Sequence, residues 1–465
     1  MAATQKTYEH RNPAAPDEVT GRYPSAGPAE VDAAVSAAAA ALDEWAATPA
    51  PARGRILAGA ARALEARLEQ VAKDMTREMG KPIREARGET GRGVQILDYY
   101  AGEGLRAVGE LYEQSATGNP VYTMRRPVGV VGLITPWNFP AAIPLWKAAP
   151  ALAYGNTVVL KLALDSPRTG LHLAECLAEA GLPEGVLNVL TGPGSTAGAA
   201  LVADPRVAAV SFTGSVEVGA SVRETATARG ARVQLELGGQ NPLIVADDAK
   251  LDAAVEAAYA GAFWSAGQKC TATRRIYLQD GIYDAFRERF LARVAAGKVG
   301  DPADAATEVG PLVNERQLDE VLAGIERGRA EGGTVLAGGG RLDRDGFFVE
   351  PTVFEGVADE AFLSCEEVFG PVTALYRFRE IDEALERANA VRFGLAASLF
   401  TQSIETSARF VRGLRAGILH VNSQTAGAEV HVPFGGTKGS GYGPHEQGRS
   451  AIEFYTDVVT VYHDA

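Results

Sequence analysis

Three cysteines are spread over the 465 residues of the chain, and Cys270 comes directly after a glycine turn in the stretch GQKC (267–270). Most cysteines are inert packing residues. A reactive cysteine needs a partly exposed, electropositive setting, which a turn or helix start can provide, because such a setting lowers the pKa of the thiol. A thiolate that attacks a carbonyl carbon leaves negative charge on the oxygen. Cys270 is therefore a candidate nucleophile if the chain supplies donors for that oxygen.

Two polar residues stand where apolar surroundings do not explain them. Asn138 lies in the proline-bounded turn TPWNFP (135–140), where its amide can donate to an oxyanion together with the backbone N–H of Cys270. Glu236 ends an apolar strand, and burial there raises the pKa of a carboxyl group, as suits a general base that activates water. Each residue alone also fits a structural role, Asn138 in a turn and Glu236 in a buried ion pair.

The elements that must position these residues form two series. From about residue 128, short apolar runs flanked by Gly, Pro or Asn alternate with helical segments, at 128–134, 157–162, 186–190, 207–212, 233–237 and 242–246. Buried strands separated by crossover helices indicate a parallel, doubly wound sheet, which binds ligands beyond the carboxyl ends of its strands. A second alternating series, from about 274 to 421, predicts a second α/β domain.

The two ends of the chain differ from this pattern. Residues 29–48 are rich in alanine and helical in pattern. Apolar residues between Leu57 and Met75 recur at helical spacing, so we expect one helix there, which ends at the stretch 80–82. The last segment, 452–463, predicts a lone strand with no later partner, which we expect to pair elsewhere, for example with another subunit.

Composition narrows the class of protein. A formal net charge of −13 argues against nucleic acid or an anionic membrane as the main partner, since both select basic surfaces. Neither a charged-then-apolar leader nor an apolar run of membrane-spanning length is present. The widely spaced Cys176, Cys270 and Cys365 and the six dispersed histidines predict a reducing cytoplasm and no structural metal, with Cys176 and Cys365 expected to be packing residues. We expect a cytoplasmic enzyme.

Taken together, the motifs resemble those of the aldehyde dehydrogenase superfamily. PWNFP, FTGS (212–215), ELGGQNP (236–242), GQKC, EEVFGP (366–371) and PFGGTKGSG (433–441) stand in the family's order, and the resemblance runs from about residue 11 to the end. It implies an α/β fold with two doubly wound parallel-sheet domains plus a small β oligomerisation hairpin. We therefore expect an NAD(P)-binding domain at 1–107 and 128–238, a catalytic domain at 239–433, and oligomerisation segments at 108–127 and 449–465.

The resemblance also implies roles for individual residues. Cys270 matches the nucleophile, Asn138 the oxyanion donor and Glu236 the base that activates the deacylating water, so an aldehyde is oxidised to an acid through a thiohemiacetal and a thioester. The expected cofactor residues are Trp137, Lys161, Gly194, Phe212, Gly214, Ser215, Val218, Leu237, Glu367 and Phe369. Among them, Gly214 and Ser215 alone are a weak phosphate-loop signal, because no G-x-G-x-x-G is present.

The choice between the two cofactors depends on a departure from the family pattern. Where the family commonly has K-P-[SA]-E, this chain has KLALDSP (161–167), so a glutamate that would repel a 2′-phosphate is missing. We expect NADP to be preferred, with NAD as the alternative. Asp165, one position further on, would reverse this preference if its side chain reached the ribose. The family's usual opening strand with N-G-x-W is also missing before residue 10.

Four stretches, 88–106, 138–159, 267–275 and 422–436, resemble a bacterial subgroup that oxidises 2-oxoglutarate semialdehyde (2,5-dioxopentanoate). The expected aldehyde tunnel comprises Phe139, Ile143, Trp146, Trp264, Thr271 and Phe434. Such a substrate is an anion and requires an arginine. Trp146 occupies the position of the arginine in succinic semialdehyde dehydrogenases, so Arg106 and Arg274 are our candidates. Each also fits a purely structural role.

Other activities stay open. The apolar Trp146 and Trp264 would suit a broad-specificity enzyme for aliphatic or aromatic aldehydes. A catalytically silent relative could dispense with Cys270 or Glu236, and a CoA-acylating relative usually lacks the glutamate, yet both residues are present. By resemblance, the segment 122–129 belongs to a hairpin that crosses to a second subunit, so we expect a homodimer or homotetramer.

Overall fold

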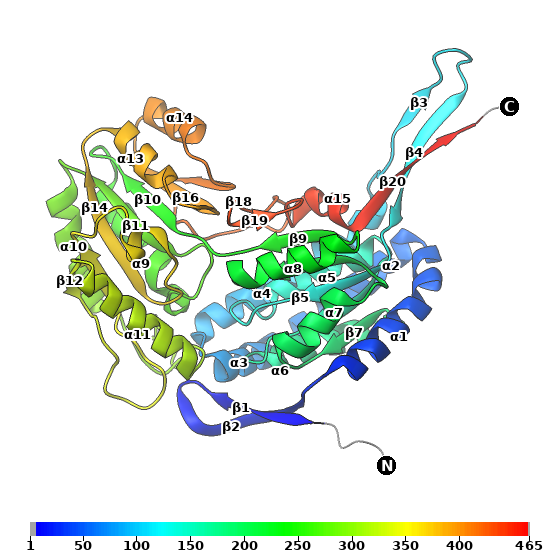
Figure 1. The fold of residues 1–465 in the computed structure, drawn as a ribbon, viewed down its shortest axis with the longest axis horizontal. Helices are drawn as coiled ribbons and strands as arrows, with labels where there is room; N and C mark the ends of the chain where they lie inside the picture. Colours follow the sequence, from blue (N-terminus) through cyan, green and yellow to red (C-terminus); the bar gives the residue numbers. More distant parts are fainter. Residues whose placement is uncertain (1–5, 464–465) are drawn as a thin grey trace.

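The structure is a computed structural model that describes residues 6–463. Two α/β units lie side by side, and a narrow three-stranded sheet projects from one of them (Figure 1). The predicted ranges 1–107 and 449–465 each include a few residues outside the described part, namely 1–5 and 464–465. Within residues 6–463, no helix is both long and apolar enough to cross a membrane.

The first unit is built on a six-stranded sheet of order β19-β9-β8-β5-β6-β7, in which only the short β19 is antiparallel. Its strands are β5 (Val130–Ile134), β6 (Thr157–Lys161), β7 (Leu187–Leu190), β8 (Val207–Thr213), β9 (Arg232–Glu236) and β19 (Gly441–Tyr442). The fully buried apolar runs of β5 and β6 fit a sheet that is covered on both faces. The expected doubly wound sheet is confirmed.

Helices cover both faces of this sheet and form two separate cores. One core contains residues of α2 (Ala50–Ala66), α3 (Leu68–Met79), α4 (Ile83–Ala101), α5 (Ala142–Ala153) and α6 (Pro167–Glu179). The other contains residues of α1 (Pro28–Ala47), α7 (Ala199–Ala203) and α8 (Val216–Ala228). The apolar spacing from Leu57 to Met75 spans two helices rather than one, since Arg67 lies between α2 and α3. Helix α3 ends at Gly80, whose φ of 76° is a left-handed cap.

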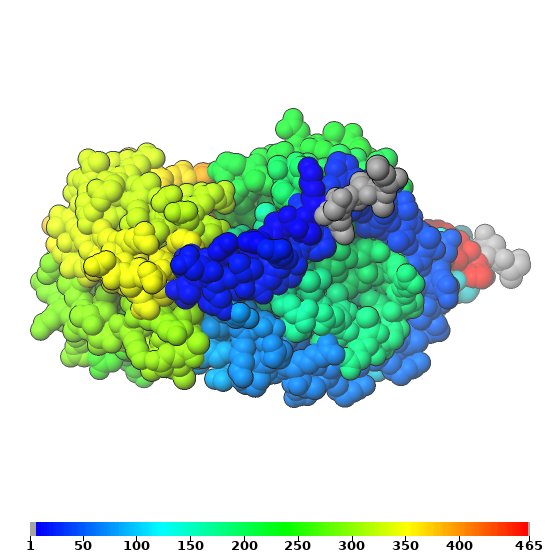
Figure 2. All heavy atoms as spheres, turned by 90° about the horizontal axis from the view of Figure 1, so that it is seen from below, coloured from blue at the N-terminus to red at the C-terminus, as the bar shows by residue number. Residues whose placement is uncertain are grey.

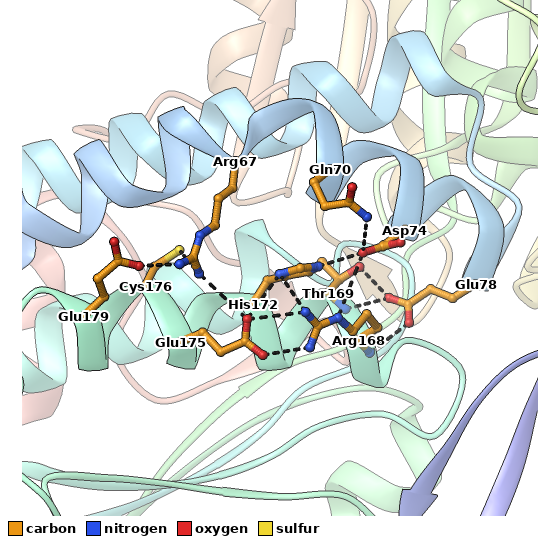
Figure 3. Close-up of polar contacts among 10 residues, drawn as sticks. All are labelled: Arg67, Gln70, Asp74, Glu78, Arg168, Thr169, His172, Glu175, Cys176 and Glu179. Carbon is orange, nitrogen blue, oxygen red and sulfur yellow. Dashed lines mark hydrogen bonds and ion pairs between the residues drawn. The ribbon is translucent and has the colours of Figure 1, made fainter.

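A polar cluster joins α3 to the start of α6 (Figure 3). Glu78 is buried and accepts hydrogen bonds from the backbone N–H groups of Arg168 and Thr169, each at 2.9 Å. Beside it, His172 contacts Asp74 at 2.7 Å. A carboxylate at a helix N-terminus satisfies backbone N–H groups that the helix itself leaves unpaired. The cluster therefore fixes α6 on α3 without using any of the predicted site residues.

The second unit is a seven-stranded sheet of order β12-β13-β14-β11-β10-β16-β17, antiparallel only between β12 and β13. Its strands are β10 (Asn241–Val245), β11 (Thr273–Gln279), β12 (Thr334–Ala337), β13 (Thr352–Glu355), β14 (Val372–Phe378), β16 (Ala396–Phe400) and β17 (Ile418–Val421). Its helices are α9 (Leu251–Phe263), α10 (Tyr283–Ala296), α11 (Glu315–Ala330), α12 (Phe362–Cys365), α13 (Ile381–Asn389) and α14 (Ile404–Gly413). A pair of two-residue strands, β15 (Phe393–Gly394) and β18 (Thr437–Lys438), leads back to the first unit.

The projecting sheet has the order β20-β4-β3 and is antiparallel throughout. It comprises β3 (Leu111–Glu113), β4 (Pro120–Pro127) and β20 (Thr456–Tyr462), which follows the short helix α15 (Ala451–Tyr455). The last segment is a strand that pairs elsewhere, as expected, and its partner is β4 of the same chain, over seven residues of each strand. The sequence pattern missed this pair because its two strands are more than 300 residues apart.

The N-terminal edge is a hairpin of β1 (Thr7–Asn12) and β2 (Ala15–Pro24). Seen from below, it lies across the boundary between the two units (Figure 2). Its tip contacts the second unit, where the backbone N–H of Phe347 donates to the carbonyl of Pro13 at 3.0 Å. Glu18 binds Arg77 of α3 in the first unit. The hairpin thus bridges both units although the sequence lacks the family's usual opening motif.

Candidate active site

The three predicted catalytic residues come from different segments and meet between the two sheets. Asn138 follows β5, Glu236 ends β9, and Cys270 follows the short helical turn Trp264–Gly267. The Asn138 side chain donates to the carbonyl of Gln268 at 3.0 Å, two residues before the cysteine. The negative charge of Glu236 also acts on the Cys270 thiol. The structure therefore brings the thiol, the amide and the carboxyl group into one site.

The electrostatic setting of Cys270 differs from the electropositive one that the sequence suggested. Part of the residue is exposed, yet burial raises the pKa of the thiol to about 12, and the charges of Glu367 and Glu236 raise it further. Backbone N–H groups of Cys270 and Thr271 act in the opposite direction. A thiol in this setting is protonated at neutral pH, so it needs a base to accept its proton when it attacks a carbonyl.

The segment before Cys270 has an unusual backbone that its neighbours hold in place. Ser265 and Ala266 have φ values of 58° and 52°, which are uncommon for residues with a side chain. Glu85 of α4 accepts hydrogen bonds from the backbone N–H of Ser265 at 3.1 Å and from its hydroxyl at 2.5 Å. This contact fixes the strained turn, and the turn sets the position of the cysteine.

The turn that bears Asn138 rests on a buried ion pair which the sequence analysis missed. Lys81 and Glu89 are both buried, and Lys81 donates to the carbonyl of Asn138 at 2.7 Å. Glu89 accepts from the backbone N–H groups of Ala141 and Ala142 at 2.8 and 3.1 Å. The pair therefore holds the turn from two sides. A lysine immediately before Pro82, at the helix break, is a weak signal that could have been noted.

Glu236 is a buried residue, 4% exposed, and its carboxyl atom Oε2 has no hydrogen-bond partner among residues 6–463. Burial raises its pKa well above the usual range, as expected, and the charge of Glu446 raises it further. Lys147 acts in the opposite direction, as does a hydrogen bond from the backbone of Gly436. A carboxyl group with a free oxygen and a raised pKa is a stronger base than an ordinary carboxylate, as general-base catalysis requires.

Glu446 and Lys147 form a second buried ion pair that the sequence analysis missed. The Lys147 ammonium contacts Glu446 and donates to Ser211 Oγ at 2.7 Å, while Glu446 Oε2 has no partner among the described residues. Lys147 stands in the otherwise apolar helix AIPLWKAAPALA (142–153). A single lysine in a wholly buried helix is costly unless it is paired, and that was the available signal.

The predicted cofactor residues near the site come from both units. The rings of Trp137 and Phe369 meet edge to face with centroids 5.6 Å apart. Glu367 accepts from the backbone N–H of Gly239 at 3.2 Å, and burial raises its pKa to about 7. A Cβ at Gly238 would lie 2.2 Å from Glu367, so only glycine allows this approach. Aromatic rings and a carboxyl group at the mouth of the site fit a nicotinamide nucleoside.

The remaining cofactor residues lie at the strand ends of the first sheet. Ser215 caps α8, since its hydroxyl accepts from the Val218 backbone N–H at 3.3 Å, and a Cβ at Gly214 would lie 2.5 Å from the Phe212 ring. The Oγ1 atoms of Thr135 and Thr213 there are buried and have no partner among residues 6–463. Free donors beside a helix N-terminus fit an anionic group such as a pyrophosphate. Leu237 directly follows β9, and Gly194 follows β7. A Cβ at Gly194 would meet no atom within 4 Å, and the side chain of Val218 on α8 is exposed.

Lys161 ends β6 and is 6% exposed. Burial lowers the pKa of its ammonium to about 8, and the charge of Asp165 opposes this change. Asp165 itself accepts a hydrogen bond from Asn314 at 2.8 Å. The lysine thus lies at the carboxyl edge of the sheet with one carboxylate near it, and that carboxylate is engaged by the second unit. Among residues 6–463, no group of three or more His, Cys, Asp or Glu residues could hold a metal ion.

Most predicted tunnel residues are aromatic. Trp146 packs on Phe434 with ring centroids 5.5 Å apart, and Lys81 lies 4.0 Å from the centroid of Phe139. Trp264 begins the turn before Cys270, and the carbonyl of Thr271 accepts from Thr425 at 2.7 Å. Ile143 is 1% exposed and belongs to the core of the first unit. The arrangement gives a mainly apolar surround for an aldehyde.

Both predicted arginines have partners among residues 6–463, although the buried Nε of Arg274 has none. Arg106 pairs with Glu103 and stacks over Tyr99 at 4.6 Å, with its side chain 40% exposed. Arg274 is buried and donates to the carbonyls of Gly267 and Gly370 at 2.6 and 2.5 Å. Burial lowers its pKa to about 10. Arg274 therefore ties the segment before Cys270 to the segment after Glu367.

Known proteins resemble this chain over nearly all of its length. The model of the family described as "Aldehyde dehydrogenase family" matches residues 1–461. An alpha-ketoglutaric semialdehyde dehydrogenase of Bacillus subtilis is 46% identical over 97% of this chain and 93% of its own. A Haloferax volcanii enzyme named alpha-ketoglutarate semialdehyde dehydrogenase is 45% identical over 99% of this chain and 96% of its own. A betaine aldehyde dehydrogenase of Cereibacter sphaeroides is 45% identical over 97% of this chain and 92% of its own.

Solved structures agree with the fold. An Escherichia coli enzyme described as NADP dependent superposes with a TM-score of 0.96 at 37% identity, covering 99% of this chain and 95% of the other. The NAD+ complex of a Bacillus cereus aldehyde dehydrogenase superposes with a TM-score of 0.96 at 37% identity, and the match covers 99% of this chain and 93% of the other. Both nicotinamide dinucleotides are thus named among the structural neighbours.

Proposed function

The chain belongs to the aldehyde dehydrogenase family, and on that premise we propose that it oxidises 2-oxoglutarate semialdehyde to 2-oxoglutarate through a thioester on Cys270. The observation that supports the chemistry most strongly is the meeting of the Cys270 thiol, the Asn138 amide and the Glu236 carboxyl group in one buried site. The names of two relatives at 45% identity or more support the substrate.

In the first step, Cys270 Sγ attacks the aldehyde carbon and its proton passes to solvent, which reaches the partly exposed residue. The oxygen of the resulting thiohemiacetal becomes negative, and it would accept hydrogen bonds from Asn138 Nδ2 and the backbone N–H of Cys270. The Lys81–Glu89 pair keeps the Asn138 turn from moving, so these donors are already in position before the charge develops. A bound NAD(P) supplies the acceptor for the hydride that leaves the thiohemiacetal carbon.

In the second step, Glu236 would remove a proton from water, and the water oxygen would attack the thioester carbonyl. Its free Oε2 and its raised pKa support this role. The C–S bond then breaks, the thiol of Cys270 is restored, and the acid leaves. Asn138 again holds the negative oxygen during the attack. Glu446 and Lys147 beside Glu236 offer a buried route by which the proton could leave.

For the cofactor, we propose NADP in preference to NAD. Leu164 takes the place of the glutamate that would repel a 2′-phosphate, and Lys161 supplies a positive charge at the end of β6. Asp165 is the carboxylate that could reverse this preference, and its hydrogen bond to Asn314 keeps it engaged. The ratio of kcat/KM for NADP to that for NAD tests the preference, and Leu164→Glu should lower the ratio.

Initial-rate kinetics test the substrate. We expect kcat/KM for 2-oxoglutarate semialdehyde to exceed that for succinic semialdehyde, a simple aliphatic aldehyde, benzaldehyde and betaine aldehyde, with Cys270→Ala inactive on all of them. Comparable rates on neutral aldehydes would contradict the substrate and leave the oxidation of aldehydes intact. Turnover by Cys270→Ala would contradict the mechanism.

A second candidate is a broad activity on aliphatic or aromatic aldehydes. It is supported by the aromatic surround, in which Trp146 packs on Phe434 and Trp264 lies on the turn before Cys270. Aromatic faces bind neutral apolar groups and quaternary ammonium groups, but they do not bind carboxylates. The same set of aldehydes separates the two candidates.

For assembly and location, we propose a cytoplasmic homodimer or homotetramer. The projecting sheet (Figure 1) carries apolar side chains that are exposed in the single chain, namely Leu111, Tyr112, Met124, Val458 and Tyr462. Residues of this kind on a narrow sheet are typical of an interface. Three unpaired cysteines fit a reducing compartment. Light scattering of the purified protein gives the number of chains.

A further inference from the structure

Arg92, in the middle of α4, has a guanidinium that the protein does not fully use. Its Nη1 is buried and has no hydrogen-bond partner among residues 6–463. The same Nη1 forms an ion pair with Glu429 at 3.6 Å, which is beyond hydrogen-bond distance. The side chain of Glu429 is 67% exposed and that of Arg92 is 31% exposed. An arginine has five N–H donors, and a buried one without an acceptor is costly. The geometry is that of a donor that awaits an external anion.

Its neighbours on α4 locate Arg92 relative to the site. Glu89, one turn earlier, binds the backbone at Ala141 and Ala142, where α5 begins. Gly93, the next residue, packs on Leu145, because a Cβ there would lie 3.0 Å from that side chain. Since residues three and four apart on a helix share a face, Arg92 lies beside the first turns of α5, which bear the predicted tunnel residues Ile143 and Trp146.

The ion-pair partner of Arg92 lies on the other predicted wall. Glu429 belongs to the segment 422–436, whose Phe434 packs on Trp146 with centroids 5.5 Å apart. Val430, the next residue, packs against the core that also contains Trp146. Arg92 therefore lies between α5 and the segment 422–436, the two parts of the chain that surround Trp146.

Two glycines leave room beside the guanidinium. Gly88 and Gly91 are inside α4, where glycine costs about 1 kcal/mol relative to alanine. Neither has a packing reason, since a Cβ at either position would meet no atom within 4 Å. Gly93, in contrast, has neighbours at 3.0 and 3.1 Å. Gly88 is exposed and Gly91 is half-buried, so the helix gives up stability at two positions where the space next to Arg92 opens to solvent.

We propose that Arg92 binds the distal carboxylate of the aldehyde substrate and sets the preference for anionic aldehydes. This inference rests on the proposed substrate and replaces Arg106 and Arg274 in the role that the sequence analysis gave them. Glu103 engages Arg106, and two backbone carbonyls engage both Nη atoms of Arg274, so that only its Nε has no partner among residues 6–463. The planar fork of a guanidinium matches a carboxylate with two parallel hydrogen bonds, and the weakly held Glu429 yields its place to the substrate.

The test compares an anionic aldehyde with a neutral one in matched variants. Initial rates are measured for 2-oxoglutarate semialdehyde and pentanal with the wild type, Arg92→Gln, Arg92→Lys and Arg87→Gln. Arg87 is the control, because it lies on the same helix and pairs on the outside with Glu69. We expect Arg92→Gln to lower kcat/KM for the anion roughly 30-fold, mainly through KM, and that for pentanal less than about threefold. The kcat/KM of Arg92→Lys for the anion should lie between those of the wild type and Arg92→Gln, and that of Arg87→Gln should equal the wild-type value.

A second measurement does not use the semialdehyde. 2-Oxoglutarate should inhibit the oxidation of pentanal, and its inhibition constant should rise roughly tenfold in Arg92→Gln and stay unchanged in Arg87→Gln. If Arg92→Gln is insoluble, Arg92→Lys replaces it in the test. A loss of kcat/KM for the anion that exceeds the loss for pentanal then supports the role of Arg92, and equal losses overturn it.

The outcomes separate this inference from the proposed function. A wild type that prefers the anion, together with an Arg92→Gln variant that keeps the same ratio of anion to pentanal, would overturn the role of Arg92 alone. A wild type that does not prefer the anion would overturn both the substrate and the role of Arg92. An equal loss in Arg87→Gln would show a general effect of helix charge and would also overturn it.

Discussion

Two buried lysine–glutamate pairs flank the candidate site, and they differ in how completely they are bonded. In the Lys81–Glu89 pair, Glu89 accepts two backbone N–H groups in addition to the lysine, and Lys81 also binds the Asn138 carbonyl. In the Lys147–Glu446 pair, one carboxylate oxygen has no partner within residues 6–463, and Glu236 next to it has a free oxygen as well.

The difference teaches how to separate positioning from chemistry among buried charges. A fully bonded pair holds one geometry, because any movement leaves a buried group unpaired. A pair with spare acceptor sites beside a carboxyl group of raised pKa can take up and pass on a proton. The first pair therefore positions the Asn138 turn, and the second belongs to the chemistry of Glu236.

The largest effect is expected at Glu236 itself. Glu236→Gln keeps the shape of the side chain and removes its ability to accept a proton from water. We expect kcat to fall about 10³-fold, because general-base catalysis contributes about 10²- to 10⁴-fold. Single-turnover experiments should still show the burst of reduced cofactor, since the first step does not use this base. A burst that disappears together with kcat would contradict the assignment.

The next largest effect is expected at the fully bonded pair. Lys81→Met leaves the Glu89 carboxylate buried without its cation, and removal of one partner of such a pair costs about 3–5 kcal/mol. Denaturant unfolding should show this loss in the free energy of unfolding. Lys147→Met is the matched change in the second pair. Compared with Lys81→Met, it should lower the free energy of unfolding less and lower kcat more. If both variants behave alike, the proposed difference between the pairs is wrong.

Sequence reasoning captured the strand pattern and the meeting of Cys270, Asn138 and Glu236, because motifs at the ends of parallel strands converge by topology. It missed Lys147 and Glu446, which are about 300 residues apart and become partners only after folding. It also missed the pairing of β20 with β4, for the same reason. The setting of Cys270 differed from expectation because folding buries the thiol, and because the carboxyl groups of Glu367 and Glu236, which come from other segments, lie near it.

A third prediction concerns pH. After burial, the charge of Glu446 is the next largest cause of the raised pKa of Glu236. Glu446→Gln removes that charge and leaves the positive Lys147, so the pKa of Glu236 should fall. Since the base acts in its deprotonated form, the acidic limb of the kcat–pH profile should move about one unit toward lower pH. The matched change Glu89→Gln should leave the limb where it is, and an equal shift in both variants would contradict the comparison.

Glu78 extends the comparison to a buried carboxyl group that has hydrogen bonds but no ion-pair partner among residues 6–463 (Figure 3). It accepts from the backbone of Arg168 and Thr169 at the start of α6, yet burial raises its pKa to about 8 from the ordinary value of 4.5. Because the folded pKa is the higher one, the folded state keeps the proton between these values. Stability should therefore decrease as pH rises through this window.

Glu78→Gln keeps the hydrogen-bond acceptor and removes the ionisation. The difference in the free energy of unfolding between Glu78→Gln and the wild type should move in favour of the variant from pH 6 to pH 9, by about 2–3 kcal/mol. Taking the difference cancels groups common to both proteins, including the nearby Asp74 and His172. A difference that stays constant with pH would mean that the N–H groups of α6 alone stabilise the ionised carboxylate, as in a capping interaction at a solvated helix end.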